Sequence, residues 1–541
     1  MNKFWVVFLL LITSVSVVFS QNQVINQSDT QNDIYLNWHL KSPSNDLIFG
    51  AEVERAYNLI PQNKKATTII VAVLDGGIDI YHEDLKGNIW VNTNEIPDNG
   101  IDDDNNGYID DINGWNFLGN SKGENIDYEN LEVTRIYKLY KNKYDGINPK
   151  SIPANETESY NLYIEAKKIY LKKLKEAEQT RDQLNSFESS YLASKELVID
   201  YLKKDTLTID DLNTIKSEDK DLMRSAEFLR YLIEIDFSLD QIEEFKEYNN
   251  EELNYHLNLD FNPRAIINDN ILELSPTYGN NNVVGSQSEH GTFVAGIIGA
   301  VRNNGLGIDG IANSLKIMAL NVVPNGDERD KDVANAIRYA ADNGARIINM
   351  SFGKELSPQK KLIDEAILYA QQKGVLFVHA SGNDAANLDK EKNFPTKIIN
   401  KTLSVDNWIT VGASSMKNDL NFVADFSNYG KKSVDLFAPG VNIKSLVPDN
   451  KYDIFDGTSF SCPVVAGVAA LIWSYYPELS ASDIKYIILN STNVYSDLKT
   501  NKPTITTKKS KKTSFKNLSI TGGVVSAYKA FLLAESKYNK K

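Results

Sequence analysis

Cysteine is almost absent from this 541-residue chain, and the single one, Cys462, leaves no partner for an internal disulfide. A chain without disulfides must draw its stability from a packed core and from bound ions. Cys462 lies three residues after Ser459 in an apolar stretch, with no basic residue beside it. We therefore expect a small buried side chain at this position rather than a nucleophilic thiol.

Positive charge is also scarce. The chain has 58 Lys and Arg residues against 72 Asp and Glu residues, which gives a formal net charge of -14. This balance argues against a general nucleic-acid-binding or anionic-membrane-binding protein. Histidine is scarce too, with five residues in the chain, so few side chains can serve as a base near neutral pH.

Long apolar runs are missing after the N-terminus. The chain opens with Met1-Asn2-Lys3 and an apolar run over 4–18, and small residues stand at Val18 and Ser20. A run of this length is short for a membrane-spanning helix and is typical of a signal peptide. We expect residues 1–20 to be removed, no transmembrane segment afterwards, and an exported protein that is extracellular, periplasmic or at the cell surface of a bacterium.

The sequence is rich in small residues after Ser459. Gly457-Thr458-Ser459 forms a turn before an apolar run of Val, Ala and Gly that reaches Ile472, with Pro463 in its first turns. The pattern predicts a buried helix that carries a hydroxyl at its N-terminus, where the helix dipole and free amides favour a developing oxyanion. A plain N-cap serine on a core helix is the alternative at this point.

Two further segments also place a polar side chain at the edge of an apolar run. The apolar run 71–74 ends in Asp75-Gly76-Gly77, and His290-Gly291 opens a run of small and apolar residues. In the order Asp, His, Ser, these segments resemble those of the subtilisin-like serine proteases, the subtilases. The resemblance covers about residues 45–120 and 280–535, and the chain departs from the usual motifs at Gly76 and Phe293 without losing a catalytic group.

The resemblance implies the roles of four residues. Ser459 attacks the carbonyl carbon, His290 takes and returns the proton, and Asp75 orients the imidazole. Asn383, in the segment Ser381-Gly382-Asn383, supplies a side-chain amide to the oxyanion hole. The expected activity is that of a secreted serine endopeptidase that forms an acyl-enzyme with polypeptide substrates.

The resemblance also implies a substrate-binding edge. Ser351, Phe352 and Gly353 match the segment that pairs with extended substrate, and Gly382 lies in the oxyanion turn. Lys354 stands where the family often has a glycine, and we expect its cation at the pocket rim to favour acidic or hindered substrate residues.

Acidic residues gather in the segment 98–113. Asp102, Asp104 and Asn106 alternate before Gly107, with Asp110 following, which fits the opening of a calcium loop although the twelfth position is Asn113 rather than Glu. A solvated acidic loop is the alternative. The resemblance implies a second calcium site at Asp84 and Asn304, and we expect calcium to act structurally.

The regular segments alternate between strand-like and helix-like patterns. Apolar β-branched runs at 68–74, 316–322, 346–350, 375–380 and 409–413 alternate with amphipathic helices at 330–343 and 359–373. This alternation predicts an α/β fold, namely a doubly wound, mostly parallel sheet of the subtilisin type.

An insertion separates Asp75 from His290. The segment 160–202 lacks Gly and Pro and has apolar residues at the spacing of a long amphipathic helix, interrupted at Arg181, which favours a helical hairpin over a sustained coiled coil. We expect an all-helical subdomain that contacts substrate or a partner, and a purely decorative subdomain is the alternative.

The predicted organisation begins with a signal peptide (1–20), a polar segment (21–45) and the first catalytic part with the acidic loop (46–124). The helical insertion (125–272), the second catalytic part (273–535) and a tail (536–541) follow. No pro-domain fits between 21 and Asp75. A catalytically silent relative and a narrow processing protease are the rival interpretations.

Overall fold

The computed structural model describes residues 34–270, 278–505 and 510–538, so the expected signal peptide lies outside the described residues. The chain divides into two compact units. The sheet unit comprises Met1–Asp127 and Pro263–Lys541, and the helical unit is Tyr128–Asn262. The helical unit lies within the segment 125–272 that was expected as an insertion.

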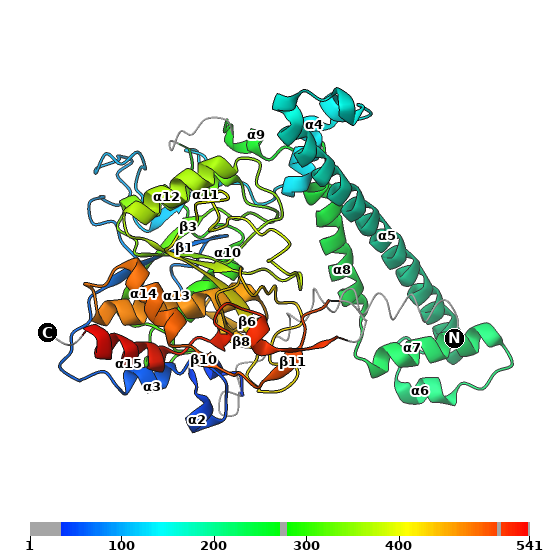
Figure 1. Cartoon of the computed structure of the whole chain (residues 1–541). Helices are drawn as coiled ribbons and strands as arrows, with labels where there is room; N and C mark the ends of the chain where they lie inside the picture. Colours follow the sequence, from blue (N-terminus) through cyan, green and yellow to red (C-terminus); the bar gives the residue numbers. More distant parts are fainter. Residues whose placement is uncertain (1–33, 271–277, 506–509, 539–541) are drawn as a thin grey trace. The chain divides into compact units, whose positions relative to one another are not determined.

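The described part of the sheet unit contains one nine-stranded sheet in the order β10-β13-β7-β6-β5-β4-β1-β3-β2 (Figure 1). Neighbouring strands are parallel, except that β10 and β13 are antiparallel. The strands are β1 (Ile69–Asp75), β2 (Gly114–Asn116), β3 (Leu315–Asn321), β4 (Ile347–Met350), β5 (Leu376–Ala380), β6 (Trp408–Ser414), β7 (Leu436–Pro439), β10 (Asn493–Val494) and β13 (Gly523–Val524). Two separate hairpins pair β8 (Ile443–Val447) with β9 (Lys451–Phe455), and β11 (Lys499–Asn501) with β12 (Lys512–Ser514).

Helices cover both faces of this sheet, so the predicted α/β architecture is confirmed. In β1, Val71 and Val73 pack into one core and Ala72 and Leu74 into another, as expected for parallel strands that are buried on both sides. The first core contains residues of α10 (Ser288–Gly299), α13 (Thr458–Tyr475), α14 (Ala481–Asn490) and α15 (Ala527–Tyr538). The second contains residues of α11 (Asp330–Asp342) and α12 (Lys360–Gln372).

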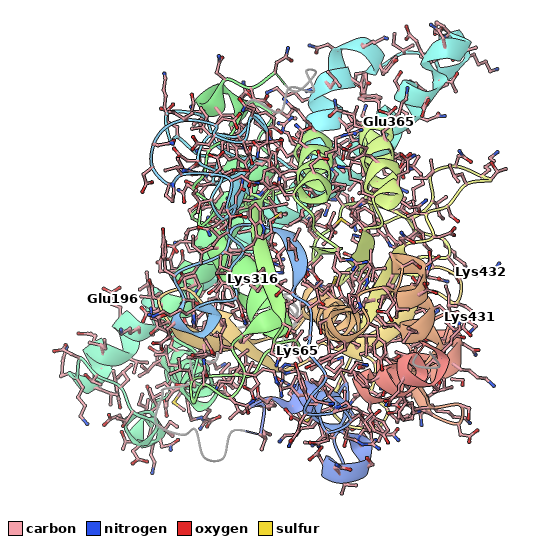
Figure 2. The ribbon with its side chains drawn as sticks, turned by 90° about the vertical axis from the view of Figure 1, so that its left-hand side faces the viewer. Lys65, Glu196, Lys316, Glu365, Lys431 and Lys432 are labelled. Atoms are coloured by element: carbon pink, nitrogen blue, oxygen red, sulfur yellow. The ribbon has the colours of Figure 1, made fainter. Side chains whose placement is uncertain are left out.

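Short helices and charged side chains complete the surface of this unit. The short helices are α2 (Pro43–Asp46), α3 (Val53–Tyr57) and α9 (Arg264–Ile267). Figure 2 shows charged side chains of both signs, among them Lys65, Glu365 and Lys432, extending outward from the ribbon.

The predicted buried helix after Ser459 is α13. By length and composition it is the one helix among the described residues that could cross a membrane, whereas we expected no apolar run of that length after residue 20. Its apolar window is 89% buried inside the protein, which is the environment of a core helix.

The helical unit is built around one long helix. Its helices are α4 (Glu132–Tyr144), α5 (Thr157–Leu202), α6 (Ile209–Thr214), α7 (Lys220–Glu234) and α8 (Leu239–Glu251). The predicted interruption near Arg181 is wrong, because α5 runs unbroken for 46 residues. Arg181 is exposed and arginine is a strong helix former, so a polar residue there does not end the helix. Asn249 on α8 donates to the carbonyl of Ala177 at 3.1 Å and ties α8 to α5.

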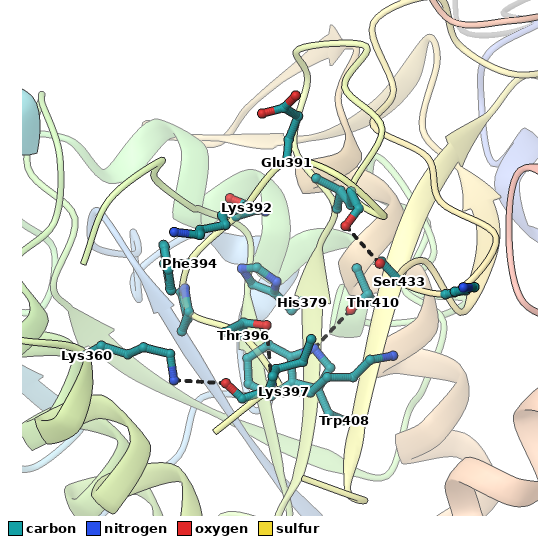
Figure 3. A pocket seen from close by; sticks show the side chains of 15 residues that line it. Lys360, His379, Glu391, Lys392, Phe394, Thr396, Lys397, Trp408, Thr410 and Ser433 are labelled. Atoms are coloured by element: carbon teal, nitrogen blue, oxygen red, sulfur yellow. Dashed lines mark hydrogen bonds between the residues drawn. The ribbon is translucent and has the colours of Figure 1, made fainter. Parts of the chain in front are cut away.

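A cavity of about 280 Å³ lies where β5 and β6 meet the loop 388–398 (Figure 3). Its walls include the His379, Phe394 and Trp408 rings, and charged residues stand at its mouth.

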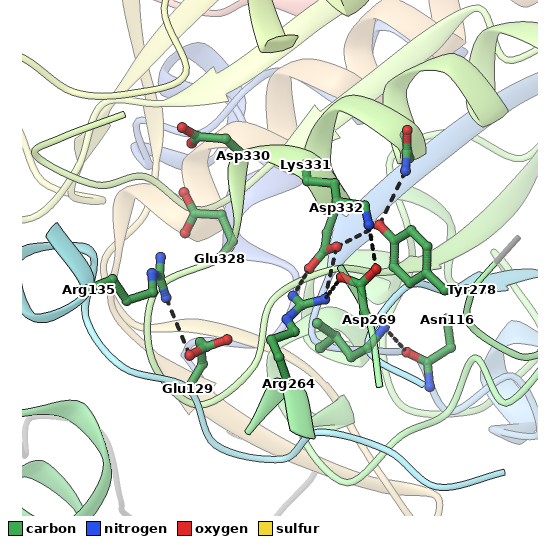
Figure 4. Close-up of polar contacts among 12 residues, drawn as sticks. Asn116, Glu129, Arg135, Arg264, Asp269, Tyr278, Glu328, Asp330, Lys331 and Asp332 are labelled. Atoms are coloured by element: carbon green, nitrogen blue, oxygen red, sulfur yellow. Dashed lines mark hydrogen bonds and ion pairs between the residues drawn. The ribbon is translucent and has the colours of Figure 1, made fainter. Parts of the chain in front are cut away.

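A buried ionic network fixes the segment that re-enters the sheet unit (Figure 4). The Arg264 guanidinium pairs with Asp332 on α11 and with Asp269 at 3.2 Å, and Lys331 pairs with Asp269. The Tyr278 hydroxyl donates to Asp332 at 2.6 Å. Because each buried charge has an opposite partner, this network holds the 264–269 segment against α11.

Candidate active site

The end of β1 and the start of α10 bring a carboxylate and an imidazole together. His290 Nδ1 lies 2.7 Å from Asp75 Oδ1, which also accepts a hydrogen bond from the Gly76 amide at 2.8 Å. A Cβ on Gly291 would lie 2.0 Å from the Gly77 carbonyl oxygen, so glycine is needed for α10 to approach the turn after β1. The neighbouring glycines of both motifs therefore set the distance between the two functional side chains.

This contact changes the titration of the imidazole. Burial lowers the pKa of His290, but the charge of Asp75, its hydrogen bond and the charge of Glu289 together outweigh burial and raise the pKa above its ordinary value. The Asp75 carboxylate is itself buried, and its Oδ2 has no hydrogen-bond partner among the described residues. The imidazolium is thus the form that this pair stabilises.

Ser459 lies in the first turn of α13, beside the imidazole. The ring of the next residue, Phe460, lies 5.5 Å from the His290 ring. The Ser459 hydroxyl donates to the Ser351 carbonyl at 2.9 Å, and no hydrogen bond joins it to His290, although both residues are described. In this rotamer the Ser459 hydroxyl is therefore held by the end of β4.

The departure at Phe293 has a packing reason. Its ring is fully buried, stacks on the Phe455 ring at 4.7 Å between centroids, and lies tilted against the Phe460 ring at 4.4 Å. An aromatic ring at this position supports the helix that carries Ser459.

Asn383 follows β5 and is held by the residue before the serine. Its Oδ1 accepts hydrogen bonds from the Thr458 amide at 3.0 Å and the Thr458 hydroxyl at 2.8 Å. The Gly382 amide donates to the same hydroxyl at 3.1 Å. Because Oδ1 is occupied, the amide nitrogen Nδ2 remains as a donor on the exposed side, near the N-terminal amides of α13 that have no helical partner.

The expected substrate-binding residues lie around the same helix end. Ser351 is buried, and its hydroxyl donates to the Ser459 carbonyl at 2.7 Å. The Phe352 carbonyl accepts from His379, and a Cβ on Gly353 would lie 2.3 Å from the Asn393 side chain. Ser351 therefore fixes α13 to the end of β4, while Phe352 and Gly353 continue the chain beyond it.

The expectation for Lys354 is wrong. Its side chain is 1% exposed, and its ammonium group pairs with Asp330 at 2.8 Å and donates to the Glu328 carbonyl at 2.7 Å. A lysine that turns inward to a buried carboxylate presents no cation to a substrate at the pocket rim.

Comparison with known proteins agrees with this geometry. The family model described as the subtilase family matches residues 66–518. The chain belongs to the subtilase family.

Three relatives illustrate the similarity. A thermophilic serine proteinase of Bacillus sp. (strain AK1) is 40% identical over 188 residues, which are 35% of this chain and 43% of that protein. Subtilisin Savinase of Lederbergia lenta is 36% identical over 213 residues, covering 38% and 73%. The cell wall-associated protease of Bacillus subtilis (strain 168) is 34% identical over 207 residues, covering 38% and 21%. The chain thus spans less than half of the first and third relatives.

One expected cation site of this subtilase is a buried carboxylate. Asp84 is fully buried and accepts from Asn304 Nδ2 at 2.7 Å and from the Ile308 amide at 3.3 Å. Burial raises the pKa of Asp84, and no Lys or Arg pairs with it within the described ranges. The Asn304 side-chain oxygen accepts from the Leu306 amide at 2.9 Å, so the feature that fits calcium is the buried Asp84 carboxylate without a Lys or Arg partner among the described residues.

The acidic loop is arranged differently from the predicted pattern. Asp102 accepts from the amides of Asn106 and Gly107 at 3.0 and 2.8 Å, and Asp110 accepts from the amides of Asn99 and Gly100 at 3.1 and 2.9 Å. These contacts fold the loop on itself.

The closest group of carboxylates in this loop is Glu95, Asp104 and Asp111, whose oxygens lie within 4.8 Å of one another. Burial raises the pKa of Asp111 to about 6, and the charge of Asp104 adds to this effect. Sequence reasoning missed Glu95 and Asp111 as candidate ligands. The signal that could have found Asp111 is its position three residues before β2, where the loop enters the core.

Proposed function

We propose that this subtilase is an exported serine endopeptidase that hydrolyses polypeptides through an acyl-enzyme. The observation that carries the proposal is the 2.7 Å contact of His290 with Asp75 at the N-terminal end of the helix that bears Ser459. A buried carboxylate, an imidazole and a helix-terminal hydroxyl, with an amide donor fixed nearby, are the groups that acyl transfer requires.

The proposed reaction begins with a rotation of the Ser459 hydroxyl away from the Ser351 carbonyl and toward the imidazole. Ser459 Oγ then attacks the substrate carbonyl carbon while His290 Nε2 accepts its proton, and Asp75 stabilises the imidazolium. Asn383 Nδ2 and the Ser459 amide donate to the oxyanion. The imidazolium gives its proton to the leaving amine, and a water molecule releases the acyl group by the same steps.

We further propose that extended substrate pairs with the backbone of Ser351, Phe352 and Gly353, and that Gly382 borders the reacting carbonyl. Export is supported by the charge and apolar pattern of residues 1–20 and by the likeness to a protein named a cell wall-associated protease. The helical unit is proposed to contact substrate or a partner, since it enters the chain between two members of the triad.

Structural calcium is part of the proposal. Asp84 and Asn304 would hold one ion, and Glu95, Asp104 and Asp111 would hold a second. Calcium would neutralise buried carboxylates and stiffen the two loops, and it takes no part in the chemical steps.

The proposal is tested by the hydrolysis of an internally quenched peptide library by purified protein with calcium present. We expect cleavage within peptides, loss of activity to background in Ser459→Ala and His290→Ala, and retention of the folded state in both variants. A folded wild-type protein that cleaves nothing would favour the silent, binding-only alternative. A Ser459→Ala variant as active as wild type would contradict the role proposed for Ser459.

A further inference from the structure

The cavity beside β5 and β6 has features of a ligand site that the triad does not use. Its volume is about 280 Å³, and apolar groups, including Phe394 and Trp408, form much of its wall (Figure 3). An apolar cavity of roughly 150 Å³ is already large enough to hold benzene. This space therefore accommodates a bicyclic aromatic molecule.

His379 gives the cavity a polar group whose protonated nitrogen is defined by its contacts. The side chain is buried, and its Nε2 lies 2.9 Å from the Phe352 carbonyl oxygen. A carbonyl only accepts, so Nε2 carries the proton. Burial lowers the pKa of His379 to about 4, so the ring is neutral near pH 7 and Nδ1 is an unprotonated acceptor. Nδ1 has no hydrogen-bond partner within the described chain.

A second polar group stands on the adjacent strand. The Thr410 hydroxyl accepts from the indole nitrogen of Trp408 at 3.0 Å, and Thr410 is 6% exposed. The cavity wall thus combines aromatic surface with a hydrogen-bond acceptor that the described chain leaves unused. A ligand that covers this acceptor without donating to it leaves it unsatisfied, which is unfavourable.

We propose that this cavity binds an aromatic group that carries one N–H or O–H donor, with the donor on His379 Nδ1 and the ring between Phe394 and Trp408. The group is either a free small aromatic molecule or a tryptophan or tyrosine side chain of a polypeptide, since both present the same chemistry. The site goes beyond the proposed hydrolysis and does not depend on it.

The same histidine connects the cavity to the proposed substrate edge. Its Nε2–H holds the Phe352 carbonyl, and the backbones of Phe394 and Lys354 exchange two hydrogen bonds of 2.9 and 3.0 Å. A ligand on Nδ1 therefore contacts His379, which holds the Phe352 carbonyl of the proposed substrate edge. We expect its binding to change KM for peptides more than kcat.

The test compares two isomers that differ in the donor alone. Ligand-observed NMR titration of the full Ser459→Ala protein with 3-methylindole and 1-methylindole keeps ligand size constant while removing the N–H. Since an unmet buried acceptor is costly, we expect 3-methylindole to bind at least about fivefold more tightly. N-acetyltryptophanamide is titrated alongside, and binding of this capped residue assigns the site to peptides whereas exclusive binding of the free indole assigns it to small molecules.

The variant His379→Phe removes the acceptor and is expected to abolish the preference between the isomers. Thr410→Val leaves Nδ1 in place and is expected to retain it. Equal binding of the two isomers by the Ser459→Ala protein, no saturable binding of either, or an unchanged preference when His379→Phe is added to a folded Ser459→Ala protein would overturn the proposal. If the variant with His379→Phe does not fold, the isomer comparison on the Ser459→Ala protein decides alone.

Discussion

At the scale of single residues, the site depends on how Thr458 and Asn383 are joined. Both donors of Thr458 go to Asn383 Oδ1, so the orientation of the carboxamide is fixed before substrate binds. A preorganised donor costs no reorientation in the transition state, which is where its contribution to rate arises.

Replacement of this donor should lower turnover. We expect Asn383→Ala to reduce kcat by about 10²–10³, the effect found in subtilisin when one oxyanion donor is removed, with little change in KM. Thr458→Val keeps the donor but removes one of its two anchors, so we expect a loss of about fivefold, the size of one neutral hydrogen bond. Steady-state kinetics on one peptide would measure both. Equal losses in the two variants would contradict the assigned roles.

The pH dependence of activity should reflect the raised pKa of His290. In the proposed reaction the neutral imidazole is the base, so kcat/KM should rise with pH through a midpoint above the ordinary histidine pKa of about 6.5. Asp75→Asn removes the negative charge that raises this pKa, so its residual activity should rise at lower pH. A pH profile of kcat/KM for both proteins checks the sign, and a midpoint that stays in place in the variant would contradict it.

At the scale of elements, the strongly patterned segments were predictable. The positions of β1, α10 and α13 followed from an apolar run that ends in Asp75 and from two runs that begin at His290 and Ser459, because burial on all sides leaves a clear pattern. The continuity of α5 did not follow, since one exposed arginine resembles a break in periodicity without ending a helix.

Contacts between distant segments were not predictable. Lys354 turns toward Asp330, twenty-four positions earlier in the chain. Glu95 comes close to Asp104 and Asp111 only once the chain is folded. The Ser459 rotamer likewise depends on the carbonyl at the end of β4. Local spacing carries no information on such partners.

The short helix Trp38–Leu40 of the sheet unit should be sensitive to acid. His39, in the short helix Trp38–Leu40, is fully buried, neither ring nitrogen has a partner among the described residues, and burial with the nearby charge of Arg302 lowers its pKa to about 3. The unfolded chain binds a proton near pH 6.5 and the folded chain does not, so stability falls as pH decreases from about 6.5 to 3, by about 1.4 kcal/mol per pH unit.

We expect His39→Leu to lose less stability than wild type between pH 7 and pH 4. Calorimetric melting of both proteins across this range measures the difference, with His256→Leu as a control for a histidine that is not fully buried. Parallel pH curves for wild type and His39→Leu would show that His39 does not contribute.

At the scale of the whole molecule, calcium is expected to stabilise the sheet unit. A ligand at a hundred times its dissociation constant stabilises the folded state by about 2.7 kcal/mol, so chelation should lower Tm by several degrees. Asp84→Asn and Asp111→Asn should each weaken this response, because each removes a charge from one site. Identical melting with calcium and with chelator would contradict both sites.

Each unit has its own core, so the helical unit should be removable. Replacement of Tyr128–Asn262 by a short Gly-Ser linker should leave hydrolysis of small peptides intact and reduce cleavage of folded protein substrates, if this unit contacts substrate or a partner. Comparison of the two substrate classes measures the effect. Unchanged rates for both would leave the unit as decoration.

The central claim is that Ser459 is a nucleophile activated by His290 and Asp75. The most direct measurement is the reaction of the purified protein, with calcium present, with a fluorophosphonate, followed by peptide mass spectrometry. The account predicts one phosphonylated site at Ser459, absent in Ser459→Ala and slowed strongly in His290→Ala. A folded protein that remains unlabelled, or is labelled equally in Ser459→Ala, would contradict it.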